Sequence, residues 1–438
     1  MTSLGFVSLS RCTSGGSETE GSAADPTNIF QLVRDPNGYL DLPKGFEYKV
    51  ISRSGQTMSD GLLVPGRPDG MGAFLNAQGQ CVLVRNHENS PGSPEFSAFG
   101  KENELLDKVE ARQLYDAGKM ETPALGGTTT LVYDEDKGEV VEEFLSLAGT
   151  TRNCAGGITP WNSWLTCEET VERADGDQIE KDHGFVFDVP ALSKGLVNPE
   201  PIQDMGRFNH EAVAVDPNTH IVYQTEDRPD GLIYRFIPND KNDLQQGGAL
   251  EVLAIKGRSS LDTRNWDEPT VKLNEPMEVV WLPMDDVLSP EDDLRFRGYH
   301  KGAARFARGE GMWMGEQEVY FACTNGGPKN FGQIFRYNIA NNTLELFAES
   351  ADKTVLNMCD NLTISPKGDL FVCEDNSDLN RIHYISKKGE IREFAINRSS
   401  GSELAGAVFS PSGKTLFVNI QVNGDTVAIT GPWEGLVV

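Results

Sequence analysis

The sequence predicts an all-β fold, and within that class a β-propeller, from three observations. From about residue 28 onward, short runs rich in β-branched residues alternate with turns of Gly, Asp, Asn and Pro. Three segments, 212–227, 362–376 and 407–421, share one order of strand, Pro-containing turn and strand. Thr363 and Val408, in two of these segments, are 45 residues apart, close to the length of a propeller blade. A β-sandwich is the structural alternative, although its strands would not normally repeat one turn at this spacing.

Residues 28–438 are expected to form this single propeller domain, with two insertions near 100–122 and 285–308. Residues 101–120, KENELLDKVEARQLYDAGKM, have helical spacing and strong helix formers. The second stretch is charged and reads as partly helical. We expect both to be short helical insertions between blades, placed as lids or walls around a central site.

Residues 1–27 are expected to be the remnant of an export signal followed by a flexible linker. The apolar piece at the start is too short for a complete signal core, and a Ser/Gly/Glu tract follows it. Cys12 fits a lipid-anchored cysteine poorly, because Leu9, Ser10 and Arg11 precede it. No run of 18 or more apolar residues occurs, so no membrane-spanning helix is expected.

The chain is strongly acidic, with 39 Lys and Arg against 66 Asp and Glu and a formal charge of -27. Such a surface should repel nucleic acid and anionic lipid, so neither is expected as a partner. It should also repel a phosphate ester, unless metal ions reverse the local sign. The seven Cys form no CxxC pair, which argues against a zinc knuckle.

Several short motifs place acids at strand ends beside Gly or Asn. The longest is RNCAGGITPWNSWLTCEET at 152–170, and RGEGMW at 308–313 sets an acid between two glycines. Neither a GxSxG nucleophile elbow nor a P-loop is present. The candidate site residues in these motifs are Asn86, Glu88, Cys154, Glu168, Glu169, Glu211, Glu226, Asp227, Arg308, Glu310, Asp360, Glu374 and Asp375.

The inner strand of each propeller blade lines the central channel, so acids at equivalent inner-strand ends would converge on the axis. Carboxylates that close cannot all stay ionised without cations. Oxygen ligands suit Ca²⁺, and a thiolate such as that of Cys154 shifts the balance toward a softer metal such as iron. Any one of these residues alone is more often a structural turn or strand-end residue than a ligand. Taken together, they predict an axial metal site.

These motifs resemble those of the PhoX alkaline phosphatase family. The resembling pieces span residues 85–433 and include RNHE, LAGTTRNCAGGITPWNSWLTCEE, GRFNHEAVAVDP, VYQTEDRPDGLIYRFIP, RGEGMW and CDNLTISPKGDLFVCED. The resemblance implies six blades, an axial cluster of two Fe³⁺ and three Ca²⁺ ions, and hydrolysis of small-molecule phosphomonoesters. It also implies a periplasmic or secreted protein exported by the twin-arginine route, although no twin-arginine motif stands in this sequence. We expect a monomer.

The resemblance also implies residue roles. Cys154 would bind iron, with Glu169 favoured over Glu168 at the CEE motif and with Glu211 and Glu310 as further ligands. Arg308 would hold the substrate phosphate through two parallel hydrogen bonds. Further ligands, some of them for calcium, would come from Asn86, Glu88, Glu226, Asp227, Asp360, Glu374 and Asp375.

Two other functions remain open from the sequence. A calcium-dependent propeller hydrolase acting on lactones or phosphotriesters would need no thiolate, so Cys154→Ser would be nearly harmless. A non-catalytic propeller that binds protein or glycan would hold structural calcium but no iron, and would turn nothing over. A thiolate–iron(III) site would absorb visible light, whereas either alternative would be colourless.

Overall fold

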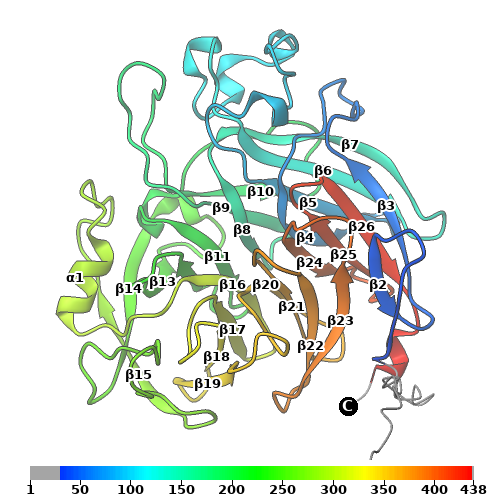
Figure 1. The fold of residues 1–438 in the computed structure, drawn as a ribbon. Helices are drawn as coiled ribbons and strands as arrows, with labels where there is room; N and C mark the ends of the chain where they lie inside the picture. Colours follow the sequence, from blue (N-terminus) through cyan, green and yellow to red (C-terminus); the bar gives the residue numbers. More distant parts are fainter. Residues whose placement is uncertain (1–29, 437–438) are drawn as a thin grey trace, which may run out of the picture.

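The computed structural model describes residues 30–436, which form five antiparallel β-sheets arranged around one axis (Figure 1). The predicted export-signal remnant and linker at 1–27, including Cys12, lie outside the described residues. The all-β propeller prediction is confirmed. None of the helices among residues 30–436 has the length and apolar character that crossing a membrane would require.

The first two sheets follow one another along the chain. The first contains β4 (Pro68–Leu75), β5 (Cys81–His87), β6 (Gly126–Asp134) and β7 (Glu139–Thr150). The second contains β8 (Asn153–Ile158), β9 (Ser163–Glu168) and β10 (Val186–Pro190).

The third sheet is the largest, because β15 pairs with β19 and so joins two blade-like halves. One half contains β11 (His210–Val215), β12 (Val222–Glu226), β13 (Ile233–Pro238), β14 (Gly248–Ile255) and β15 (Met277–Pro283). The other contains β16 (Gly309–Met314), β17 (Glu318–Cys323), β18 (Gln333–Asn338) and β19 (Thr343–Glu349).

The N-terminal strands complete the last two sheets. β1 (Leu32–Val33) and β2 (Leu40–Pro43) extend the sheet of β20 (Cys359–Ile364), β21 (Leu370–Glu374), β22 (Arg381–Ile385) and β23 (Ile391–Asn397). β3 (Glu47–Arg53) pairs with β26 (Asp425–Thr430), beside β24 (Leu404–Phe409) and β25 (Thr415–Ile420). Figure 1 shows the blue β3 beside the red β26, so strands from the two ends of the chain close the ring.

Within the described residues, the strands nearest the axis are β4, β8, β11, β16, β20 and β24, each packed on the next, and β24 packs on β4. Counted by hydrogen-bonded sheets the described propeller has five units, whereas counted by these inner strands it has six. Small residues allow the close packing. A Cβ at Gly70 would lie 2.6 Å from the Cα of Ala155, and one at Gly311 would lie 2.7 Å from the carbonyl oxygen of Asp360.

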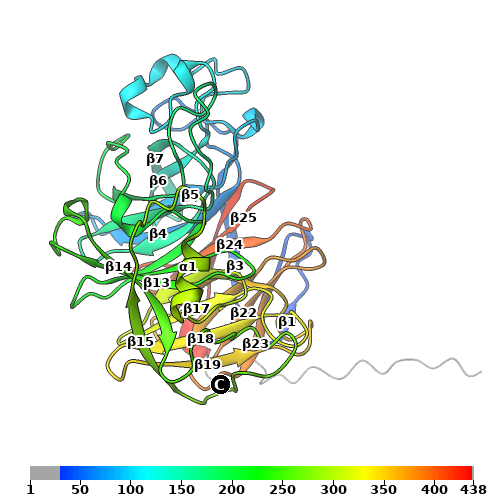
Figure 2. The same ribbon diagram turned by 90° about the vertical axis from the view of Figure 1, so that its left-hand side faces the viewer.

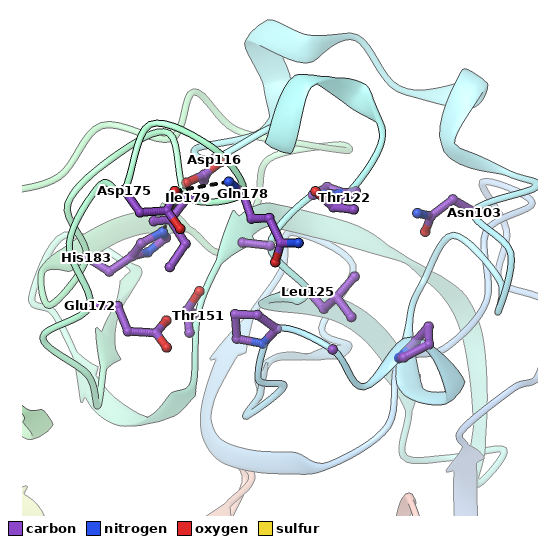
Figure 3. Close-up of a pocket in the computed structure, with 15 residues that line it drawn as sticks. Asn103, Asp116, Thr122, Leu125, Thr151, Glu172, Asp175, Gln178, Ile179 and His183 are labelled. Atoms are coloured by element: carbon purple, nitrogen blue, oxygen red, sulfur yellow. Dashed lines mark hydrogen bonds and ion pairs between the residues drawn. The ribbon is translucent and has the colours of Figure 1, made fainter.

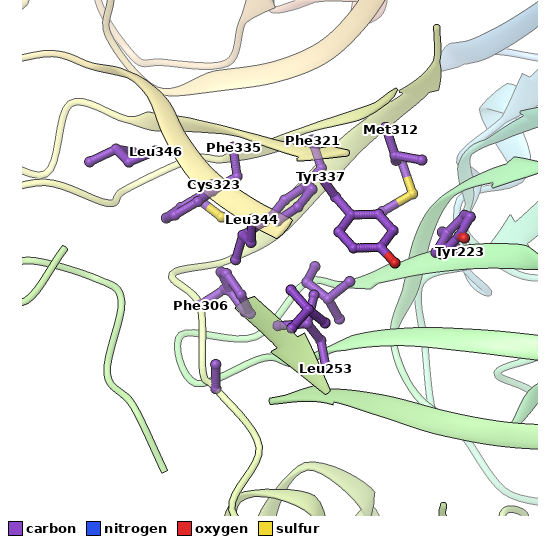
Figure 4. Close-up of a cluster of buried hydrophobic side chains, with 14 of the residues drawn as sticks. Tyr223, Leu253, Phe306, Met312, Phe321, Cys323, Phe335, Tyr337, Leu344 and Leu346 are labelled. Carbon is purple, nitrogen blue, oxygen red and sulfur yellow. The ribbon is translucent and has the colours of Figure 1, made fainter. Parts of the chain in front are cut away.

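The hydrophobic core lies between neighbouring blades rather than on the axis. In the cluster of Figure 4, the ring of Phe306 meets Phe321 and Phe335 edge to face at 5.4 and 5.3 Å. Such edge-to-face pairs add to the free energy gained from burying the rings. This packing fixes the blades against one another and leaves the ends of the inner strands for polar residues.

The first insertion differs from its prediction in two respects. It joins β5 to β6 inside one sheet rather than two blades, and 101–120 form the short 3-10 turns Leu106–Lys108, Ala111–Gln113 and Gly118–Met120 in place of a helix. Left-handed backbone at Gly118, Lys119 and Met120 ends any helical run. Burial of Leu106 and Leu114 in their own small core, which includes Phe99 and Leu145, overrides the helical propensity.

The second insertion is partly helical, as predicted. It follows β15 and contains α1 (Leu294–Lys301), which lies on the flank of the molecule and faces the viewer in Figure 2. Arg295 anchors α1 to the loop after β12 through Asp230 at 3.2 Å. The insertion therefore packs against the segment that carries Asp227.

Candidate metal centre

Five inner strands carry a metal-binding residue type at the same place, the second residue of the strand. The first residue of each strand pairs with its neighbour strand, and regular pairing resumes only at the fourth. This local irregularity changes the direction of the side chain at the second residue, as β-bulges near active sites do. The residues so placed are Asp69 on β4, Cys154 on β8, Glu211 on β11, Glu310 on β16 and Asp360 on β20. In β24 the irregularity falls one residue later, and no acid stands in the strand.

A second set of acids follows directly after the second strand of four blades. These residues are Glu88, Glu169, Asp227 and Asp375. Each backbone N–H donates to the carbonyl of the residue that precedes the inner strand, as from Glu169 to Arg152 at 2.9 Å and from Asp375 to Met358 at 3.0 Å. This bond holds the acid beside the start of the inner strand. We call the end of the channel where the inner strands begin the axial mouth.

Among the described residues, three groups of side chains bring their ligand atoms within 4.8 Å of one another. They are Cys154 with Glu169 and Glu211, then Glu211 with Glu310 and Asp360, and finally Asp69 with Glu88 and Glu403. Because Glu211 belongs to two groups, these adjoin. We call the three groups together the axial cluster.

Burial and mutual repulsion raise the pKa values of the axial cluster. Burial, and then the charge of Asp227, raise the pKa of Glu169 to about 8. Burial and the charge of Asp375 raise the pKa of Asp360 to about 7, and burial with the charge of Glu211 raises that of the Cys154 thiol. Bound cations would offset the free-energy cost of ionising these buried groups and so lower their pKa values. Carboxylates and one thiol buried together are therefore a suitable set of ligands for metal ions. The carboxylate oxygens suit hard ions, and the thiol sulfur suits a softer one.

Three arginines stand at equivalent places before inner strands at the axial mouth. Arg67, Arg152 and Arg308 directly precede β4, β8 and β16, with left-handed φ angles of 45°, 51° and 52°. Non-glycine residues seldom adopt this conformation, and those that do are found more often at functional sites. Arg308 donates from Nε and Nη2 to the two carboxylate oxygens of Asp227, both at 2.9 Å, and from Nη2 to Glu310 at 2.7 Å. Arg152 pairs with Glu169 and, at 3.0 Å, with Glu88.

The family model for the alkaline phosphatase PhoX matches residues 27–424. The chain belongs to the PhoX alkaline phosphatase family. Membership makes it a phosphatase. No curated protein sequence matches it significantly.

One solved structure supports the fold. Pseudomonas fluorescens PhoX, determined in complex with vanadate, a transition-state analogue, is similar with a TM-score of 0.67 and 20% identity, over 92% of this chain and 97% of that one. A gluconolactonase from Xanthomonas campestris has a TM-score of 0.40 and 14% identity, over 89% of this chain and 97% of its own. At that TM-score the second likeness carries no functional weight.

The structure brings most of the predicted site residues of this PhoX family member to the axial mouth. Cys154, Glu169, Glu211, Glu310, Glu88 and Asp360 lie within the axial cluster. Asp375 and Asp227 lie beside it, since their charges raise the pKa values of Asp360 and Glu310 respectively. Arg308 contacts both Asp227 and Glu310.

Three predicted ligands point the other way, namely Glu168, Glu226 and Glu374. Each is the last residue of its strand, one before a site acid, and successive side chains of a strand face opposite sides. Glu168 accepts hydrogen bonds from the backbone of Thr151 and Gly184 and lies 2.6 Å from Nδ1 of His183. Glu226 accepts from Tyr234 at 2.9 Å, and Glu374 lies 2.8 Å from Nε2 of His383. Their carboxylates are structural.

Asn86 is also structural rather than a ligand. Its amide nitrogen donates to the carbonyl oxygens of Cys154 and Ala155 at 3.1 and 2.7 Å, and its oxygen accepts from the Trp164 indole at 2.9 Å. The side chain is fully buried between β5 and β8. It thus supports the backbone of Cys154 instead of contacting a metal.

The sequence reasoning missed Asp69, Glu403 and Arg152. A signal existed for Asp69, because an acid followed by a small residue recurs at Asp69-Gly70, Glu211-Ala212 and Glu310-Gly311. Arg152 likewise stands two residues before Cys154, as Arg308 stands two before Glu310. Glu403 has no such signal, since it precedes β24, the one described inner strand that contains neither an acid nor a cysteine.

Proposed function

We propose that the chain is an exported alkaline phosphatase that hydrolyses phosphomonoesters at an iron–calcium centre in the axial cluster. The observation that carries this proposal is a buried thiol among carboxylates, with a guanidinium fixed at the mouth above them. Acids alone would suggest only calcium. The arrangement supports a site that neutralises and orients a phosphate dianion within an otherwise acidic protein.

The donor types suggest how the ions would be divided. Cys154, Glu169 and Glu211 would hold iron, because this is the group with a thiolate. Asp69, Glu88 and Glu403 would hold calcium, because they offer only carboxylate oxygens. Glu211, Glu310 and Asp360 lie next to the first group and would complete the centre, for which we propose two Fe³⁺ and three Ca²⁺ ions.

Arg308 would hold the ester phosphate. Asp227 fixes the plane of its guanidinium by two parallel hydrogen bonds, and 27% of the side chain remains exposed. The bonds to Asp227 and Glu310 use Nε and Nη2, so the two parallel hydrogen bonds expected for the phosphate go to Asp227 in this structure, and Nη1 remains for a phosphate oxygen. A guanidinium held in advance needs no reorganisation as negative charge develops on the phosphate oxygens. The bound metal ions would act as Lewis acids toward the ester.

Location and assembly remain part of the proposal. We propose a periplasmic or secreted monomer exported by the twin-arginine route. The support is the resemblance of the sequence to the PhoX family, since the export-signal remnant lies outside the described residues.

The proposal is tested by turnover of a chromogenic phosphomonoester by the metal-loaded protein. Cys154→Ala should reduce kcat/KM by about 10³-fold or more, because several kcal/mol of transition-state stabilisation depend on the metal centre. Cys167→Ala is the matched control, since this equally buried cysteine on β9 faces a hydrophobic core. It should keep turnover within about threefold.

Either of two results would overturn the proposal. One is equal activity of Cys154→Ala and the wild type. The other is a colourless wild-type protein that hydrolyses a lactone or phosphotriester and not the monoester, which would favour a calcium-dependent propeller hydrolase. A protein that binds calcium and turns over none of these substrates would favour the non-catalytic propeller.

A further inference from the structure

We propose that a pocket beside the axial mouth binds the organic part of the substrate and selects a neutral group rich in hydroxyls, such as a sugar or polyol. The inference rests on the proposed function. The pocket has a volume of about 520 Å³ and lies between the first insertion and the loop that follows β9. That volume is in the range of small-molecule sites and holds one hexose unit.

Three separate wall segments of this pocket continue directly from residues of the axial mouth. Thr151 precedes Arg152, Pro91 follows Glu88 by three residues, and the third segment begins at Glu172, three residues after Glu169. Three residues of extended chain span at most about 10 Å. The pocket therefore opens beside the carboxylates and the guanidinium of the mouth, where the ester oxygen of a bound phosphate would point away from the metal centre.

The floor of the pocket carries a polar atom that no described residue satisfies. The hydroxyl of Thr151 is fully buried and has no hydrogen-bond partner in the described structure. In Figure 3 its side chain points into the space below Gln178 and Ile179. A buried hydroxyl without a partner costs free energy, and in native proteins a protein group, an ordered water or a ligand usually satisfies it. A hydroxyl of the substrate would supply the missing bond.

The remaining lining defines the class of ligand. Asp116 and His183 lie 3.4 Å apart and offset each other, so the carboxylates of Glu172 and Asp175 set a negative sign. The described lining residues include no Lys or Arg. This wall would repel a second phosphate or a carboxylate. The amides of Asn103 and Gln178 can form hydrogen bonds with further hydroxyls of the ligand. Apolar side chains offer faces for its C–H groups, and they are Pro91, Pro94, Pro123, Ala124, Leu125 and Ile179.

The test uses the metal-loaded enzyme and the ratio of kcat/KM for a hexose 6-phosphate to kcat/KM for methyl phosphate, which has nothing to place in the pocket. Thr151→Val keeps the shape of the side chain and removes the hydroxyl. The ratio should fall about 3- to 12-fold, the loss of one neutral hydrogen bond. Because the hydroxyl has no protein partner, the melting temperature should not fall.

Two further variants separate an effect of the pocket from a general effect of the substitution. Thr363→Val makes the same change at another buried hydroxyl without a described partner, on β20 outside the pocket, and should leave the ratio unchanged. Thr122→Trp narrows the pocket from an exposed rim position and should lower the ratio. An unchanged ratio in both Thr151→Val and Thr122→Trp, or an equal fall in Thr363→Val, would overturn the inference. Failure of the wild type to hydrolyse either ester would instead overturn the proposed function.

Discussion

The two ends of the axial channel differ completely in chemistry, although the same inner strands run between them. β16 begins with the buried acid Glu310 at the axial mouth and ends at Met314. At that opposite end, β8, β11 and β16 line a pocket of about 310 Å³ with residues such as Ile158, Val215 and Trp313. The contrast shows that the propeller fold alone does not create a metal site.

Backbone geometry accounts for the difference. At the mouth, the first residue of β11 is paired and pairing resumes only at Val213, whereas Val213 to Val215 then pair one by one with β12. Regular pairing at the far end places side chains between blades, where apolar residues are favoured. The irregular start turns one side chain per strand toward the axis. The paired strands that follow Arg152 and Arg308 hold these two residues in their strained left-handed conformation, as surrounding structure does at other functional sites.

The largest effect should come from comparing the two ends of one strand. Glu310→Gln removes a charge from the axial cluster and should lower kcat/KM for a phosphomonoester by about 10³-fold. Met314→Leu, at the other end of β16, conserves volume and should leave turnover within about threefold. Circular dichroism first checks that both variants are folded. Steady-state assays then measure kcat/KM for each. Similar losses in the two variants would contradict a site confined to the mouth.

A smaller but sharper comparison concerns two adjacent acids. Glu168→Gln removes the nearer of the two carboxylate partners of the buried, charged His183 and leaves only Asp116 at 3.4 Å, so it should lower the free energy of unfolding by up to about 3–5 kcal/mol. Glu169→Gln should abolish activity without lowering the stability of the metal-free protein, because burial and the charge of Asp227 outweigh the pairing of its carboxylate with Arg152. Urea unfolding measures the first effect and a phosphatase assay the second. Exchange of the two phenotypes would show that the side chains have been assigned to the wrong faces.

The last comparison is the pH dependence of stability that the same structural carboxylate, Glu168, imposes through His183. Burial lowers the pKa of His183, but Glu168 and Asp116 outweigh it and raise that pKa to about 10 from an ordinary value of 6.5. The folded state therefore holds a proton that the unfolded state releases. This stabilisation is complete below pH 6.5 and is lost as the pH rises toward 10. Tyr115 and the guanidinium of Arg207 also contact His183.

His183→Asn is the variant that isolates this contribution. Its unfolding free energy, measured between pH 6.5 and 10, should be lower than that of the wild type at the acid end. The difference between the two proteins should shrink as the pH rises. A constant difference across this range would contradict the raised pKa of His183.

The sequence was sufficient to predict the propeller and most of the axial cluster, because turn chemistry and acids at strand ends are local signals. The family resemblance favoured Glu169 over Glu168, but the sequence could not separate Glu226 and Glu374 from the acids that follow them, since one residue of register decides which face a side chain takes. Nor did it predict Glu403, which reaches the cluster through tertiary packing alone. The insertion at 101–120 shows the same limit, because its buried contacts override helix propensity.

The metal content of the purified protein, measured together with its visible absorption, tests the proposed iron–calcium centre most directly. We expect two iron and three calcium ions per chain, a visible band from the thiolate, and loss of that band in Cys154→Ala but not in Cys167→Ala. A colourless wild-type protein that contains no iron, or a band that survives in Cys154→Ala, would contradict it.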